Sequence, residues 1–140
     1  CLTVTRDADR RGAVAGLMEH LNRQSYAFPP DHGARVVQTI LDDDELRTLW
    51  STELTMMRET MNANRAALAK TLRHETGSDR FGFLADHRGM FSLIGATPEQ
   101  VETLRRDHAI YVVGDGRMNV AGLTPATIPK VARALAAVLT

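Results

Sequence analysis

The stretch DDDELRTLWSTELTMMRETMNANRAALAKTLRHE, residues 42–75, decides how the rest of the chain is interpreted. It contains no glycine or proline, and its apolar residues recur at the spacing of one helix face: Leu46, Leu49, Trp50, Leu54, Met57, Met61, Leu68 and Leu72. The sequence therefore predicts one helix that begins on carboxylates and ends before Gly77. From the rise per residue of an α-helix its length is about 45 Å, which is typical of a helix that connects two domains or lies along an interface.

Shorter elements are predicted before this helix. Residues 1–5 alternate between apolar and polar side chains, as in a strand. Apolar side chains at positions 14, 17, 18 and 21 favour an amphipathic helix over about residues 10–24, with Asp7 or Asp9 as its N-cap. Phe28-Pro29-Pro30 ends that helix, because a residue before proline is disfavoured in the helical conformation. A second helix is predicted over about residues 31–41.

After Gly77 the pattern changes to short, alternating elements. The expected order is a strand at 81–84, a turn at 87–89, a strand at 90–94, a helix at 97–107, a hairpin of strands at 110–113 and 117–121, and a last helix that begins near Thr124 or Pro129. The helix at 97–107 opens with Thr-Pro-Glu-Gln, which has the spacing of a capping box. The predicted fold class is α+β, a small and mostly antiparallel sheet with helices packed on it.

Composition excludes several classes of protein. The chain has 140 residues, 44% hydrophobic and 24% charged, as expected of a soluble globular domain. Its 17 basic and 17 acidic residues give a formal net charge of zero, which disfavours nucleic acid and anionic membranes as partners. The single cysteine, Cys1, suits a reducing compartment, so a cytoplasmic location is expected. Because the chain begins with Cys and not Met, it is expected to be the later part of a longer protein.

Few residues carry a recognisable chemical signal. The five histidines do not pair with one another or with cysteine at metal-ligand spacing, so no metal site is expected. Arg117 follows a glycine turn and could bind a carboxylate through two hydrogen bonds, or could be an ordinary surface arginine. Arg23 is explained on the residues alone as a cation that is favourable near the C-terminus of its helix.

Several segments together resemble the aspartate/aromatic aminotransferases. Residues 29–34, Pro-Pro-Asp-His-Gly-Ala, resemble that family's Asn-Pro-Pro-x-His-Gly-Ala segment. Residues 116–125, Gly-Arg-Met-Asn-Val-Ala-Gly-Leu-Thr-Pro, resemble its Gly-Arg-hydrophobic-Asn-hydrophobic-Ala-Gly-hydrophobic-Thr segment. Residues 89–92, Gly-Met-Phe-Ser, match a third stretch, and the long helix lies where the family has one. The resemblance covers essentially the whole chain, in order and with matching spacing.

The resemblance implies a homodimeric enzyme that uses pyridoxal phosphate (PLP). In that family a large domain holds the cofactor and a small domain closes over the substrate. Residues 1–43 would then be the end of the large domain, and residues 44–140 the long helix with most of the small domain. The substrates implied are amino acids, aromatic or dicarboxylic, and 2-oxo acids.

The resemblance also implies roles for three residues. Arg117 matches the arginine that binds the α-carboxylate of the substrate, and Phe91 matches a phenylalanine near the substrate. Arg23 matches the arginine that reaches the neighbouring subunit's site and pairs with the distal carboxylate of a dicarboxylic substrate. Two departures bear on these roles. Ala27-Phe28 replaces a polar Ser-Asn pair and favours aromatic or bulkier substrates, and Asp115 replaces a common serine and is expected to compete for Arg117.

The lysine that forms the Schiff base with PLP does not match any position of this chain. Its two lysines, Lys70 and Lys130, fall within predicted helices away from the matched segments. The 140 residues alone are therefore expected to lack activity and to hold no cofactor, whereas the whole protein is expected to be an aminotransferase. The alternative is a non-catalytic α+β module that binds another protein or a small molecule.

Overall fold

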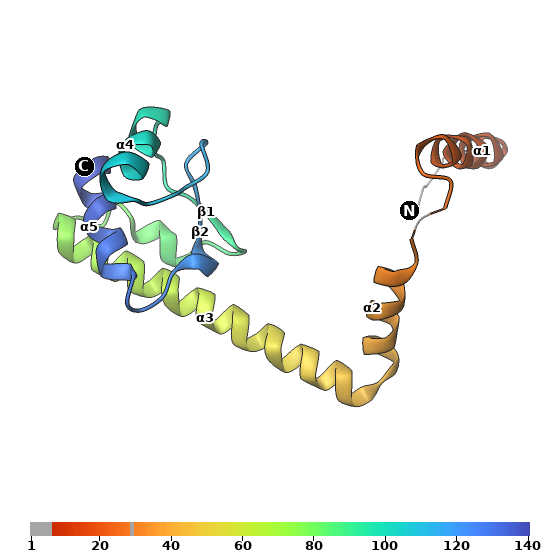
Figure 1. The fold of residues 1–140 in the computed structure, drawn as a ribbon, viewed down its shortest axis with the longest axis horizontal. Helices are drawn as coiled ribbons and strands as arrows, with labels where there is room; N and C mark the ends of the chain where they lie inside the picture. Colours follow the sequence, from red (N-terminus) through yellow and green to blue (C-terminus); the bar gives the residue numbers. More distant parts are fainter. Residues whose placement is uncertain (1–6, 29) are drawn as a thin grey trace. The chain divides into compact units, whose positions relative to one another are not determined.

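The computed structural model describes residues 7–28 and 30–140 and divides into two units, residues 1–50 and 51–140. The boundary between the units falls within one long helix, α3 (Asp44–Thr76) (Figure 1). The strand predicted at residues 1–5 lies outside the described residues. The fold class is α+β, as predicted, because most elements are helices and the sheet has two antiparallel strands.

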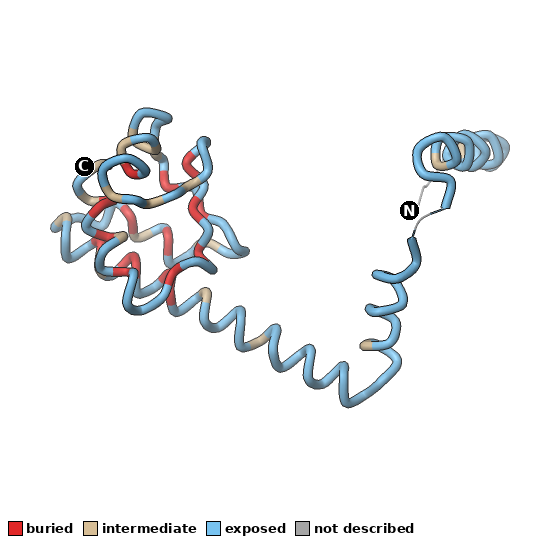
Figure 2. Tube along the Cα trace, in the orientation of Figure 1, coloured by how far each residue is buried: buried red, intermediate tan, exposed pale blue. Residues whose placement is uncertain are grey.

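The first unit contains two separate helices and the start of α3. Helix α1 (Ala8–Ser25) begins at Asp7, whose side chain accepts a hydrogen bond from the Asp9 backbone N–H at 2.9 Å. Helix α2 (His32–Asp42) follows the proline segment. Both helices confirm the predicted ones within two residues at each end. Neither helix buries a side chain, and Figure 2 shows them almost entirely as exposed.

Helix α3 confirms the prediction made from residues 42–75. The Asp43 carboxylate accepts hydrogen bonds from the backbone N–H groups of Glu45 and Leu46, both at 2.9 Å, and so caps the first turn. The helix ends where Gly77 adopts the left-handed conformation, with φ +65°, a conformation that glycine adopts without steric cost. Only its second half is buried, through Asn64, Arg65, Leu68, Ala69 and Leu72.

The second unit has one hydrophobic core. The buried part of α3 packs there with α4 (Pro98–His108), α5 (Ile128–Leu139) and the strands β1 (Phe91–Leu93) and β2 (Arg117–Asn119). The predicted capping box of α4 is confirmed, since Thr97 and Gln100 exchange side-chain-to-backbone hydrogen bonds. Helices α4 and α5 pack against each other (Figure 1), and the buried residues in Figure 2 concentrate here. The largest fully buried apolar side chains are Leu68, Leu72, Leu84, Leu104, Val120 and Leu135.

Two predicted strands are wrong. Residues 81–84 do not form a strand, and Gly82–Ala85 is a 3-10 helix, η1. Phe81 and Leu84 are both buried, and their spacing of three residues fits the period of a 3-10 helix. The mixture of apolar residues and glycine in this segment was therefore compatible with either structure.

The turn of the predicted hairpin is present, and the Val113 N–H donates across it to the Arg117 carbonyl, but the expected pairing of two strands is wrong. Residues 110–113 are not a strand, although Ile110 and Val112 pack partly against the core. Strand β2 pairs with β1 instead, antiparallel, with Phe91 opposite Asn119, Ser92 opposite Met118 and Leu93 opposite Arg117. A second 3-10 helix, η2 (Val120–Gly122), follows β2 directly, so the predicted strand at 117–121 is shorter than expected. Met118 and Val120 are buried, and pairing with β1 places both against the main core.

Ala109, the C-cap of α4, has φ +53° and ψ +41°, a left-handed conformation that is unfavourable for a residue with a Cβ. We expect Ala109→Gly to raise the free energy of unfolding by about 0.5–1 kcal/mol, because glycine removes this cost. The measurement is the midpoint of thermal unfolding of the full-length protein. Ala66→Gly, on an exposed position of α3, is the control and should lower the midpoint; a fall for both variants would contradict the assignment.

Candidate functional site

The two strands present one buried and one exposed face. Ser92 and Met118 lie opposite each other on the buried face, whereas Phe91, Leu93, Arg117 and Asn119 lie on the exposed face. This division follows from the alternation of side chains along a strand. Phe91 and Arg117 are diagonal neighbours in this register, which places two residues predicted for the site on one face of the sheet.

The turn before β2 fixes the position of Arg117. The Gly116 N–H donates to the Val113 carbonyl at 2.8 Å, and the Val113 N–H donates to the Arg117 carbonyl at 2.9 Å. Gly116 has φ +82°, and a Cβ on it would lie 3.1 Å from the Ala96 carbonyl oxygen. Both its backbone conformation and its close approach to Ala96 therefore require glycine.

The guanidinium of Arg117 has two neighbours. Its Nε donates to Asp115 Oδ2 at 2.7 Å, and the backbone N–H of Arg117 donates to the other carboxylate oxygen, Oδ1, at 3.1 Å. Its Cζ lies 5.8 Å from the centroid of the Phe91 ring, which is cation–π distance. About half of the Arg117 side chain remains exposed. In the part of the chain that the structure describes, neither terminal nitrogen, Nη1 or Nη2, has a hydrogen-bond partner.

Behind the sheet lies a buried arginine that sequence reasoning missed. Arg65, only 1% exposed, donates from Nη1 to the side-chain Oγ of Ser92 and from Nη2 to the Gly89 carbonyl, and so contacts the chain on both sides of Phe91. Burial lowers the pKa of its guanidinium, and the positive charge of Arg88 lowers that pKa further. The available signal was periodicity, because position 65 lies on the same helix face as Met61, Leu68 and Leu72.

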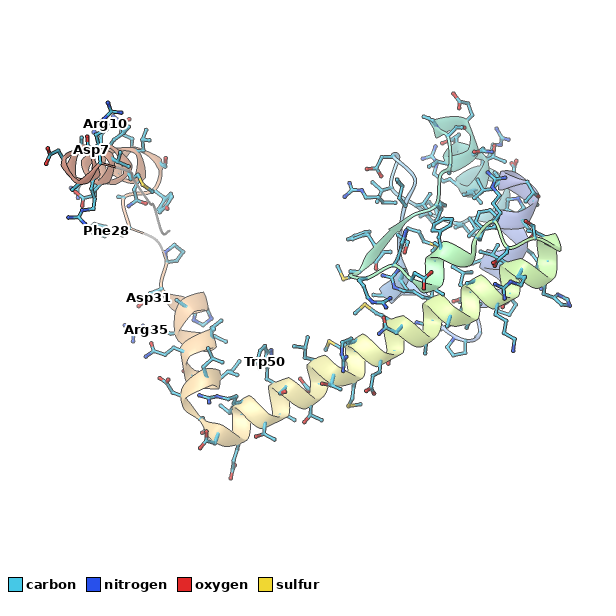
Figure 3. The ribbon with its side chains drawn as sticks, turned by 180° about the vertical axis from the view of Figure 1, so that it is seen from behind. Asp7, Arg10, Phe28, Asp31, Arg35 and Trp50 are labelled. Carbon is cyan, nitrogen blue, oxygen red and sulfur yellow. The ribbon has the colours of Figure 1, made fainter. Side chains whose placement is uncertain are left out.

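Arg23 lies in the first unit, in the last turn of α1. Its Cζ is 5.9 Å from the ring centroid of Phe28, which is labelled in Figure 3 and is 78% exposed. Among residues 7–28 and 30–140, no carboxylate forms an ion pair with Arg23. Arg23 and Arg117 belong to different units.

A hollow of about 310 Å³ opens beside β2 and is lined by Tyr111, Asn119 and Lys130 among others. Arg117 does not line it, so the hollow is separate from the Arg117 site. Within the described ranges, no three His, Cys, Asp or Glu side chains are grouped so that they could hold a metal ion. Nor does any described helix combine the length and apolar character needed to cross a membrane.

Comparisons with known proteins show the family to which the chain belongs. The family model for aminotransferase class I and II matches residues 2–135, and this chain belongs to that family. The chain is 52% identical over 134 residues to the aromatic-amino-acid aminotransferase of Paracoccus denitrificans, covering 96% of this chain and 34% of that protein. It is 40% identical over 139 residues to the aspartate aminotransferase of Escherichia coli strain K12, covering 99% of this chain and 35% of that protein.

The structural comparison agrees with the sequence comparison. A solved aromatic amino acid aminotransferase with 3-indolebutyric acid superposes with a TM-score of 0.87 and 51% identity, covering 98% of this chain and 35% of that one. The chain therefore spans about a third of the length of the relatives that it matches. Enzymes of this family are transferases that depend on PLP.

The residues around Arg117 fit a carboxylate and do not fit the cofactor. PLP is bound in such enzymes as an imine of a lysine. Lys70 on α3 and Lys130 on α5 are exposed, and neither forms an ion pair with a described residue of this site. The cation at the centre of the site is an arginine, which does not form such an imine under physiological conditions because it stays protonated.

Proposed function

We propose that the protein containing this chain transfers an amino group between an aromatic or dicarboxylic amino acid and a 2-oxo acid. The observation that carries the proposal is the unpartnered Nη1–Nη2 end of Arg117, held beside Phe91 on the exposed face of the sheet. An amino acid and a 2-oxo acid both carry an α-carboxylate, so one arginine serves both half-reactions. The Paracoccus denitrificans and Escherichia coli relatives, named for aromatic amino acids and for aspartate, support these substrate classes.

The α-carboxylate of the substrate would accept two parallel hydrogen bonds from Arg117. Bidentate pairing fixes both the position and the orientation of a carboxylate, because the guanidinium is planar and its donors are rigidly spaced. A fixed carboxylate fixes the neighbouring Cα, which is the atom that loses its proton in amino transfer. The contribution of Arg117 is therefore orientation of the reacting bond. Phe91, beside the guanidinium, would contact the substrate from the same face.

The domain roles are part of the proposal. Residues 1–43 would belong to the large, cofactor-binding domain, and residues 44–140 would form the connecting helix and most of the small domain. The active protein would be a cytoplasmic homodimer. The 140 residues alone would not transfer amino groups, because neither Lys70 nor Lys130 is available as the imine-forming lysine. The direct test is glutamate formation by the full-length protein from 2-oxoglutarate with phenylalanine or with aspartate; no glutamate from either amino acid in the presence of PLP would contradict the proposal.

Arg23 would bind the distal carboxylate of dicarboxylic substrates across the dimer. We expect Arg23→Ala to lower kcat/KM for aspartate by about 10- to 100-fold and to leave phenylalanine within about 3-fold, because only aspartate has a second carboxylate. The measurement is kcat/KM of the full-length protein for both amino acids. Arg10→Ala, an exposed arginine of the same helix, is the control. Equal losses for both substrates would contradict this role of Arg23.

A further inference from the structure

We propose that Asp115 is a positioning residue that occupies the Nε edge of Arg117 and so directs the substrate carboxylate to the Nη1–Nη2 end. The inference rests on the proposed function, because it assumes that Arg117 binds the α-carboxylate. It replaces the expectation from sequence that Asp115 competes with the substrate for Arg117. The two roles predict opposite effects of removing the Asp115 charge.

The two carboxylate oxygens of Asp115 accept hydrogen bonds from different parts of Arg117. Oδ1 accepts from the backbone N–H of Arg117 at 3.1 Å, and Oδ2 accepts from Nε at 2.7 Å. The carboxylate is therefore shared between the main chain and the side chain of one residue and is not bidentate on the guanidinium. The main-chain bond fixes the Asp115 side chain, and that side chain then fixes the Nε edge of Arg117.

A guanidinium offers a carboxylate two kinds of paired edge. One edge is Nη1 with Nη2, and the other is Nε with a neighbouring Nη. Since Asp115 already takes the hydrogen of Nε, the second edge cannot bind another carboxylate through two hydrogen bonds. The Nη1–Nη2 end has no hydrogen-bond partner among the described residues. A substrate carboxylate is thereby directed to that end.

Electrostatic repulsion and the Phe91 ring also favour binding of the substrate carboxylate at the Nη1–Nη2 end. Two carboxylates on one guanidinium repel each other, and the repulsion is weakest when they lie farthest apart. The Nη1–Nη2 end is the part of the guanidinium most distant from Nε, so it is also the electrostatically favoured position. The Phe91 ring lies at cation–π distance from the guanidinium, with its centroid 5.8 Å from Cζ, and favours this position of the Arg117 side chain. Phe91 and Asp115 together therefore hold the rotamer of a long, flexible side chain before the substrate arrives.

Because the Asp115–Arg117 ion pair is exposed, its effect on substrate binding can be measured separately from any effect on folding stability. The side chains of Arg117 and Asp115 are 52% and 53% exposed, and exposed ion pairs contribute little to folding stability. Asp115→Asn should therefore leave the unfolding transition unchanged. The amide oxygen of asparagine can still accept the main-chain N–H bond, so the turn is kept. What is lost is the charged acceptor for Nε.

The test measures binding of a carboxylate to the full-length protein with its cofactor. The probe is 3-phenylpropionate, and its neutral amide is the comparison ligand; both dissociation constants are measured by calorimetry. We expect Asp115→Asn to raise the dissociation constant of 3-phenylpropionate by about 5- to 10-fold and to leave that of the amide unchanged. For phenylalanine as substrate, KM should rise by a similar factor, with kcat within about 2-fold.

A matched control exists on the same unit. Asp107 accepts from the Nε and Nη2 of Arg106 at 2.7 and 2.9 Å, and this pair is similarly exposed, so Asp107→Asn removes a charged partner of an arginine Nε at another position. It should change neither dissociation constant. A lower dissociation constant of 3-phenylpropionate in Asp115→Asn would show that Asp115 competes with the substrate, and would overturn the proposal. An unchanged dissociation constant would also overturn it, because the Asp115–Arg117 ion pair would then have no effect on carboxylate binding. If Arg117→Leu binds 3-phenylpropionate as tightly as the unaltered protein, the proposed function fails as well.

Discussion

Replacing Arg117 by leucine is expected to lower kcat/KM by about 100- to 1,000-fold for every amino acid and 2-oxo acid substrate of the full-length protein. The reason is that leucine removes both hydrogen bonds to the α-carboxylate, a group that all these substrates share. The loss should be similar for phenylalanine and for aspartate, in contrast to Arg23→Ala. The measurement is kcat/KM for both amino acids and for 2-oxoglutarate.

Folding should not account for this loss. Arg117 is half exposed and pairs only with an equally exposed carboxylate, so the leucine variant should unfold within a few degrees of the unaltered protein. Arg106→Leu, which removes a comparable exposed ion pair, provides the control and should retain full activity. If Arg117→Leu retains kcat/KM within about 3-fold of the unaltered protein, Arg117 does not bind the substrate and the assigned role is wrong.

The largest effect on stability is expected at Arg65. Arg65→Ala leaves the Gly89 carbonyl and Ser92 Oγ without their donor and opens a cavity behind β1, so the free energy of unfolding should fall by about 2–3 kcal/mol. The change also removes a buried charge, which is why the expected loss is smaller than the sum of the separate costs. The measurement is the urea midpoint, together with amide hydrogen exchange across residues 89–93.

Two comparison variants make this prediction specific. Arg58→Ala removes the same side chain from an exposed position of α3 and should leave the midpoint unchanged. Arg65→Lys keeps one cationic donor and should recover part of the loss, since an ammonium cannot reach both acceptors in the manner of a planar guanidinium. An Arg65→Ala protein with unchanged midpoint and unchanged exchange at residues 89–93 would contradict a supporting role for Arg65.

Local signals predicted the helices well. Helix α3 follows from an uninterrupted apolar stripe, and α4 from a capping box whose hydrogen bonds the structure contains. These features depend on residues within four positions of one another, so the sequence displays them directly. The general position of Arg117, at the start of a strand after a glycine turn, was predictable for the same reason.

The pairing of β2 with β1 and the contacts of Arg65 behind the sheet could not be predicted from local sequence signals. Residues 110–113 and 117–121 are neighbours in the chain and separated by a glycine turn, a pattern that favours a hairpin. The actual partner of β2 is β1, 24 or more residues away, because that pairing buries Met118 and Val120 in the core. The contacts of Arg65 with Gly89 and Ser92 likewise join distant parts of the chain and exist only after folding.

The close approach of Gly116 to Ala96 couples the turn before Arg117 to the segment that precedes α4. Gly116 precedes Arg117, and Ala96 precedes Thr97, the residue that caps α4. A Cβ at position 116 would lie 3.1 Å from the Ala96 carbonyl oxygen, so Ala96 would have to shift. Ala96 lies directly before the N-cap residue of α4, and Gln100 of this helix donates to the Val138 carbonyl at the end of α5 at 2.9 Å. A substitution at position 116 would therefore be tolerated in evolution only together with a change near Ala96.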